Sequence, residues 1–166
     1  MTLITLSDQQ IAELIATPKR VINPGMKPKL QKASIQVTYE LEEVHGGRRF
    51  LLYLRSNPRD PESFSCGLAY VLDGPDKMVT LCRYNGSNHV HYNPIESGEQ
   101  IAHQCHIHTA TQRYMEIGDK CDKFAESTDR YSDFDGAVSC ILQDCSITGL
   151  HQSAGSEDKG GQLNLW

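Results

Sequence analysis

The chain has 166 residues, of which 39% are hydrophobic and 22% are charged. This length and balance fit one globular domain with its own apolar core and exclude a wholly disordered chain. The formal net charge of −5 disfavours a protein that grips nucleic acid through a broad basic surface. We find neither an apolar run near the roughly 20 residues of a membrane span nor a signal peptide, so we expect a cytoplasmic protein without membrane contact.

A helix is predicted close to the start of the chain. Ser7 is a favourable N-cap, and Gln10 stands where the reciprocal residue of a capping box belongs. Pro18 is expected to end this helix, because proline cannot continue it. The segment 18–31 is rich in proline and lysine and is predicted as a connector.

Antiparallel strands are predicted next. Residues 35–42 alternate apolar and polar side chains, which indicates a strand with one buried and one wet face. The turn signal His45-Gly46-Gly47 leads to a return strand. This return strand is predicted over 48–55, and a loop over 57–62 follows it. Two more strands are predicted, over about 64–72 and 78–84, with a turn at 73–76 between them.

Helices are predicted again in the last third, one from Asp119 and a longer one capped by Ser132 or Asp133. The fold class is therefore α+β. It has an N-terminal helix, an antiparallel β-meander of about five to six strands, and C-terminal helices packed on one face. Short connections disfavour a parallel sheet. We expect one domain over residues 1–148 and a flexible tail over 149–166.

The unusual feature of the sequence is its histidine segment, which runs from His89 to His108 and holds five of the seven histidines. His89 and His91 share one face of a predicted strand, and His106 and His108 share one face of another. If these strands pair around a turn at 98–99, His89 faces His108 and His91 faces His106. That register gathers four imidazoles on one face, whereas a slip of one residue separates them.

Three interpretations of this segment stay open. In the first, the histidines only form a half-exposed polar face. In the second, a divalent transition metal such as zinc is the cofactor, and its ligands are His89, His91, His106 and His108. In the third, there is no cofactor and the histidines transfer protons near neutral pH. The catalytic groups are then His106, His108 and His91, and the substrate is held by Arg83, Tyr84, Arg113, Tyr114 and His89.

Part of the sequence is similar to known proteins. The stretch His106-Ile107-His108-Thr109-Ala110-Thr111, with Arg113-Tyr114 after it and the helix around 137–147, resembles a set of small bacterial and prophage proteins of unknown function. Genes of this kind often lie among toxin–antitoxin and phage-defence loci, so the resemblance implies a role in phage–host conflict. It implies no catalytic residues.

The leading hypothesis is a small His-dependent enzyme, similar to ribonuclease toxins, that cleaves a phosphodiester in RNA or a nucleotide. The alternative is a non-catalytic acidic binding protein, such as an inhibitor or anti-defence factor, that acts on a protein partner. The sequence leaves open whether the protein is an enzyme and whether it forms a homodimer.

Overall fold

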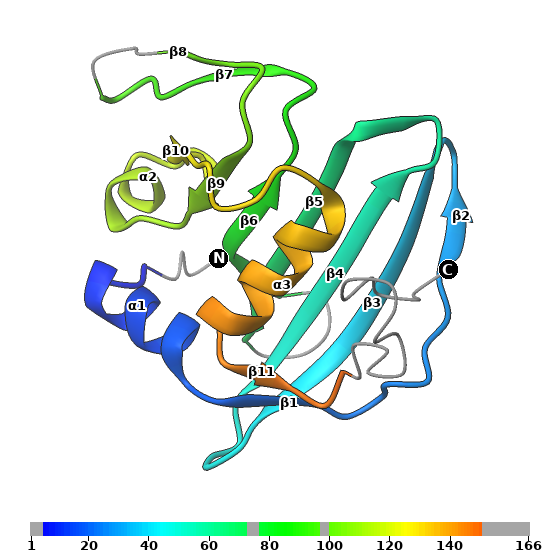
Figure 1. Cartoon of the computed structure of the whole chain (residues 1–166). Helices are drawn as coiled ribbons and strands as arrows, with labels where there is room; N and C mark the ends of the chain where they lie inside the picture. The colour runs from blue at the N-terminus through cyan, green and yellow to red at the C-terminus, as the bar shows by residue number, and fades with distance from the viewer. Residues whose placement is uncertain (1–4, 73–76, 97–99, 151–166) are drawn as a thin grey trace.

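The computed structural model describes residues 5–72, 77–96 and 100–150 of the chain (Figure 1). The helices are α1 (Asp8–Ala16), α2 (Gln112–Glu116) and α3 (Phe134–Asp144). The strands are β1 (Lys19–Val21), β2 (Lys29–Gln31), β3 (Ser34–Glu43), β4 (Arg49–Asn57), β5 (Asp60–Val71), β6 (Met78–Asn85), β7 (Val90–Tyr92), β8 (Gln100–Ala102), β9 (His106–Thr109), β10 (Ala125–Ser127) and β11 (Ile147–Thr148).

One large, mostly antiparallel sheet dominates the fold and confirms the α+β class. Its order is β10-β9-β6-β5-β4-β3-β1-β11, with β2 paired to β3, while β7 and β8 form a separate two-stranded sheet. The predicted meander is the run β3–β4–β5–β6, in which each strand pairs antiparallel with the next. In Figure 1, α3 lies across one face of this sheet.

Several elements differ from those predicted. The segment 18–31 contains β1 and β2 rather than a connector, and β1 pairs in parallel with β11, against the expectation from short connections. The helix predicted from Asp119 is wrong, because residues 119–124 make turns and β10 follows. The turn at 73–76 and the tail from residue 151 lie outside the described residues.

The helix caps follow the sequence signals. The Ser7 hydroxyl accepts a hydrogen bond from the Gln10 amide at 3.1 Å, and the Gln10 side chain accepts one from the Ser7 amide at 2.8 Å. This is the predicted capping box, which satisfies two amides that an unfinished helix end leaves without partners. Of the two residues proposed to cap the last helix, Asp133 does so, because its carboxylate accepts from the Gly136 amide at 2.8 Å.

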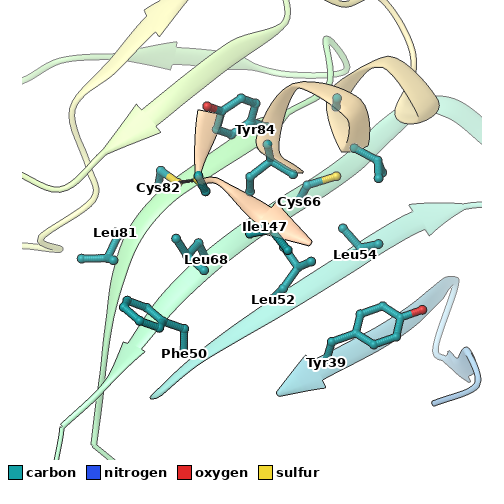
Figure 2. Close-up of a cluster of buried hydrophobic side chains, with 14 of the residues drawn as sticks. Tyr39, Phe50, Leu52, Leu54, Cys66, Leu68, Leu81, Cys82, Tyr84 and Ile147 are labelled. Carbon is teal, nitrogen blue, oxygen red and sulfur yellow. Dashed lines mark hydrogen bonds between the residues drawn. The ribbon is translucent and has the colours of Figure 1, made fainter. Parts of the chain in front are cut away.

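The core lies between α1, α3 and one face of the sheet. Strand alternation places Phe50, Leu52 and Leu54 on that face, where none is more than 1% exposed (Figure 2). Their neighbours across the sheet include Tyr39, Cys66, Leu68, Cys82 and Tyr84. Helix α3 contributes Val138 and Ile141 to the same cluster. Burial of this apolar surface is the main force that holds the layers together.

A buried lysine forms hydrogen bonds at the C-terminal ends of α1 and α3. Lys19 in β1 is 0% exposed, and its ammonium group donates to the carbonyl oxygens of Ile15 at 2.8 Å, Thr17 at 2.8 Å and Cys145 at 2.9 Å. The same nitrogen lies 4.8 Å from the centre of the Phe50 ring. A positive charge among C-terminal helix carbonyls is favourable, because these oxygens lack partners within the helix.

We expect Lys19→Met to lower the free energy of unfolding by about 3 kcal/mol, because it leaves buried carbonyl oxygens without a donor. Urea denaturation measures this loss. The control is Lys29→Met on the exposed strand β2, which should change stability by no more than about 0.5 kcal/mol. Equal stability of the two variants would contradict the role assigned to Lys19.

Candidate active site

The sheet face opposite the core carries polar residues in two adjacent rows. One row crosses β4, β5, β6 and β9 through Arg55, Ser65, Asn85 and His106. The next row crosses the same strands through Tyr53, Gly67, Arg83 and His108. The strand register that buries Leu54, Cys66 and Tyr84 on the core side therefore gathers arginine, amide, hydroxyl and imidazole groups on the other side.

The predicted pairing of the two histidine strands is wrong. Strand β7 pairs with β8, so that His91 lies opposite Ile101, while β9 is flanked by β6 and β10. Between β8 and β9 the chain turns at His103, which has a positive φ of 52°. This turn separates the short β7–β8 hairpin from the main sheet and lets β9 join β6.

The four imidazoles nevertheless converge, because the hairpin folds over β9. The ring centre of His106 lies 4.8 Å from that of His89, 5.7 Å from that of His91 and 5.0 Å from that of His108. The rings of His91 and His108 are 4.7 Å apart. The histidine cluster, defined as these four residues, thus joins two exposed or half-buried rings on the hairpin with two buried rings on β9.

Gly86 allows the loop that carries His89 to pass close to β5. Its amide donates to the Phe64 carbonyl at 3.0 Å, and a Cβ atom at this position would lie 2.1 Å from the Glu62 carbonyl oxygen. Any larger residue would push the loop away from the sheet, because the obstacle is backbone rather than a movable side chain. The glycine is therefore part of what brings His89 to the cluster.

Polar side chains tie the hairpin to the rest of the domain. Asn93 donates to the Ala125 carbonyl at 2.8 Å and accepts from its amide at 2.9 Å, in the manner of an added strand residue. Glu96 accepts from Arg113 at 2.7 Å and from the Tyr114 hydroxyl at 2.7 Å. Arg113 and Tyr114, expected as substrate contacts, thus anchor the hairpin instead of joining the histidine cluster.

Two of the other residues expected to hold substrate, Arg83 and Tyr84, lie on opposite faces of β6. Tyr84 is on the core side, where its hydroxyl donates to the Asp144 carboxylate. Arg83 is on the polar side beside His108, and its Nε donates to Asp122 at 2.5 Å. Of the expected substrate-binding residues, Arg83 and His89 therefore lie at the cluster, whereas Tyr84 does not.

Hydrogen bonds to carbonyl oxygens fix the proton positions of the buried histidines. The Nδ1 of His106 lies 2.9 Å from the Gln104 carbonyl oxygen, and the Nδ1 of His108 lies 3.0 Å from that of Asp122. A carbonyl only accepts, so both Nδ1 atoms carry the proton and both Nε2 atoms keep a lone pair. The Nε2 of His106 is buried and has no hydrogen-bond partner among the described residues.

Burial also keeps these two rings neutral. It lowers the pKa of His106 to about 4 and that of His108 to about 3, and the positive charge of Arg83 acts in the same direction. For His89, which is exposed, burial against its neighbours lowers the pKa more modestly, with contributions from His91 and Arg83. At neutral pH the buried rings are therefore uncharged, and the Nε2 atom of each can accept a hydrogen bond.

The described residues contain no group of three or more histidine, cysteine, aspartate or glutamate side chains arranged so that it could hold a metal ion. The ligand set of the zinc interpretation, His89, His91, His106 and His108, is thus brought into ring contact without forming a metal site in this arrangement.

Comparison with known proteins gives no match, whether with family models, curated proteins or solved structures. The similarity to small bacterial and prophage proteins therefore stays a prediction. Within the described ranges, no helix has the length and apolar character needed to cross a membrane.

Acid should destabilise the fold through His106. Between pH 6.5 and about 4, the unfolded chain binds a proton at this residue and the folded chain does not. The free energy of unfolding therefore falls as the pH is lowered through this window, by about 3 kcal/mol for a shift of this size. Urea denaturation across this range should show a shallower pH dependence for His106→Gln than for wild type.

The control for this measurement is His45→Gln, in the exposed turn before β4, which should keep the wild-type pH dependence. If His106→Gln and wild type lose stability in parallel as the pH falls, His106 is not a buried neutral histidine.

Proposed function

We propose that this protein is a His-dependent enzyme that cleaves a phosphodiester in RNA or a nucleotide, with its active centre at the histidine cluster. One observation carries the proposal: four imidazoles converge beside Arg83, and the innermost of them presents a buried lone pair with no partner. Leaving a buried polar atom without a hydrogen bond is costly, so such an atom calls for an explanation, and a catalytic role is one that fits here.

The low pKa values of the two buried histidines favour the other two as the groups that transfer protons. A general acid or base works best when its pKa lies near the operating pH, and pKa values of about 4 and 3 place His106 and His108 far from it. We therefore assign proton transfer to His89 and His91, the accessible members of the cluster. His106 and His108 become positioning residues that hold the accessible rings and offer neutral acceptors behind them.

The attacking hydroxyl, a ribose 2′-OH, forms the new bond to phosphorus and gives its proton to His89. The bond from phosphorus to the leaving oxygen breaks, and that oxygen takes a proton from the imidazolium form of His91. Hydrolysis of the resulting cyclic phosphate by water returns both histidines to their starting forms, so no metal or other cofactor is consumed.

Arg83 supports the charge that develops on the phosphate oxygens. Its Nε is held by Asp122, and its two Nη nitrogens have no hydrogen-bond partner among the described residues. The ion pair fixes the direction of the guanidinium, and the remaining donors suit a phosphate. Donors set in place before the reaction stabilise the transition state without the cost of reorganisation.

Cleavage of a diribonucleotide and hydrolysis of a 2′,3′-cyclic nucleotide, the substrates of the two steps, test the proposal. We expect His89→Gln to lower kcat/KM by about a hundredfold or more, because it removes the proton acceptor. His45→Gln, an exposed histidine away from the cluster, should keep wild-type activity. In wild type, the acidic limb of the pH profile should lie below pH 6.5, since surrounding groups lower the pKa of His89.

Two outcomes would count against this assignment. Unchanged activity in His89→Gln would remove His89 from the mechanism. No cleavage of either substrate by wild type would overturn the enzymatic proposal and favour the non-catalytic binding protein.

A further inference from the structure

A polar cavity adjoins the histidine cluster on the same sheet face. Its volume is about 220 Å³, and it opens between β4, β5, β6 and the loop that carries His89. The lining residues are Ser34, Arg55, Ser63, Phe64, Ser65, Arg83, Asn85, Asn88 and His89. Two arginines, one histidine and a series of hydroxyl and amide groups thus surround it, and no aspartate or glutamate does.

The charges at the cavity favour an anion. Arg83 is balanced by Asp122, whereas Arg55 has no ion-pair partner among the described residues. One uncompensated guanidinium therefore remains, next to a histidine that gains positive charge as the pH falls. Arg55 is exposed and Arg83 is half-buried, so solvent screens the charge of Arg83 less than that of Arg55.

The neutral groups are arranged as donors as well. The Ser65 hydroxyl donates to the Oδ1 of Asn85 at 2.8 Å, which fixes the orientation of that buried amide and leaves its NH₂ as the donor end. The lining offers the N–H donors of Arg83, Arg55 and Asn85, and it holds no carboxylate that could accept from them. A ligand with several acceptor oxygens matches this set.

We propose that this cavity is a binding subsite for a tetrahedral oxyanion, the phosphate group of the substrate, and that Arg55 is its principal binding residue. The volume is below the range of about 300–1,000 Å³ typical of pockets that enclose a whole small molecule. It suits a phosphate group with part of an adjoining sugar. The role as a substrate subsite rests on the function proposed above, but the binding of the oxyanion does not.

The position of His89 links the subsite to the cluster. This residue lines the cavity, and its ring centre lies 4.8 Å from that of His106. A phosphate held by Arg55 and Arg83 therefore lies beside the histidine that takes the proton from the attacking hydroxyl.

Titration of the full, isotope-labelled chain with inorganic phosphate, followed by NMR, tests the subsite without any need for catalysis. We expect binding in the millimolar range, with the largest shift changes at the amides of Ser65, Asn85 and His89. Arg55→Gln should weaken binding by about tenfold or more, since it removes a charged donor. Arg59→Gln, an exposed arginine in the turn before β5 that does not line the cavity, should bind as wild type does within about twofold.

Sulfate and acetate test whether the cavity prefers a tetrahedral oxyanion to a planar carboxylate. Sulfate, which is also tetrahedral, should compete with phosphate, and acetate should bind at least about tenfold more weakly. No binding of phosphate to wild type up to about 20 mM, equal binding by Arg55→Gln, or equal binding of acetate would each overturn the subsite.

The two proposals can fail separately. Phosphate binding that is lost in Arg55→Gln, together with no cleavage by wild type, keeps the subsite and removes the catalytic proposal. Cleavage by wild type with an unchanged KM in Arg55→Gln keeps the catalytic proposal and removes the subsite.

Discussion

The register of the central strands is the constraint on which both the core and the candidate site depend. Successive side chains of a strand point to opposite faces, so the pairing that buries Leu54, Cys66 and Tyr84 also aligns Arg55, Ser65 and Asn85 on the other side. A slip of one residue would exchange the two sets, burying the arginine and exposing the apolar side chains. The large free energy of core formation therefore also fixes the geometry of the polar face.

The β7–β8 hairpin covers His106 and His108 on that polar face, because its own histidine rings lie against theirs. The hairpin contributes two further histidines. Its Asn93 bonds to Ala125 in β10, and its Glu96 bonds to Tyr114 in α2. Strand β9 pairs with β6 on one side and with β10 on the other, whereas the hairpin is attached to the domain through side chains. The cluster thus joins two fixed neutral rings to two accessible rings, an arrangement that suits proton transfer at its rim.

Sequence patterns predicted the parts of this structure that depend on local physics. The capping box at Ser7 and the strands around Val37 and Leu52 follow from spacing alone. Convergence of the histidines was also predicted, but not the pairing that produces it, because alternation along a strand does not indicate which strand is its neighbour, and the turn at His103 gave no signal in the sequence. Lys19 gave no signal, since a buried lysine in a proline- and lysine-rich segment looks like any exposed one.

Arg55 shows why net charge is a poor guide to a local site. The chain carries a net charge of −5, and six of its eight arginines form ion pairs with carboxylates, as Arg130 does with Asp144. Among the described residues only Arg55 and Arg59 lack such a pair, and of these two only Arg55 lines the cavity. Pairing neutralises the other arginines, so the uncompensated positive charge near the histidine cluster is concentrated at one point. An acidic protein can therefore hold an anion there, because the nearby charges that line a cavity contribute more to its local potential than distant charges on the surface do.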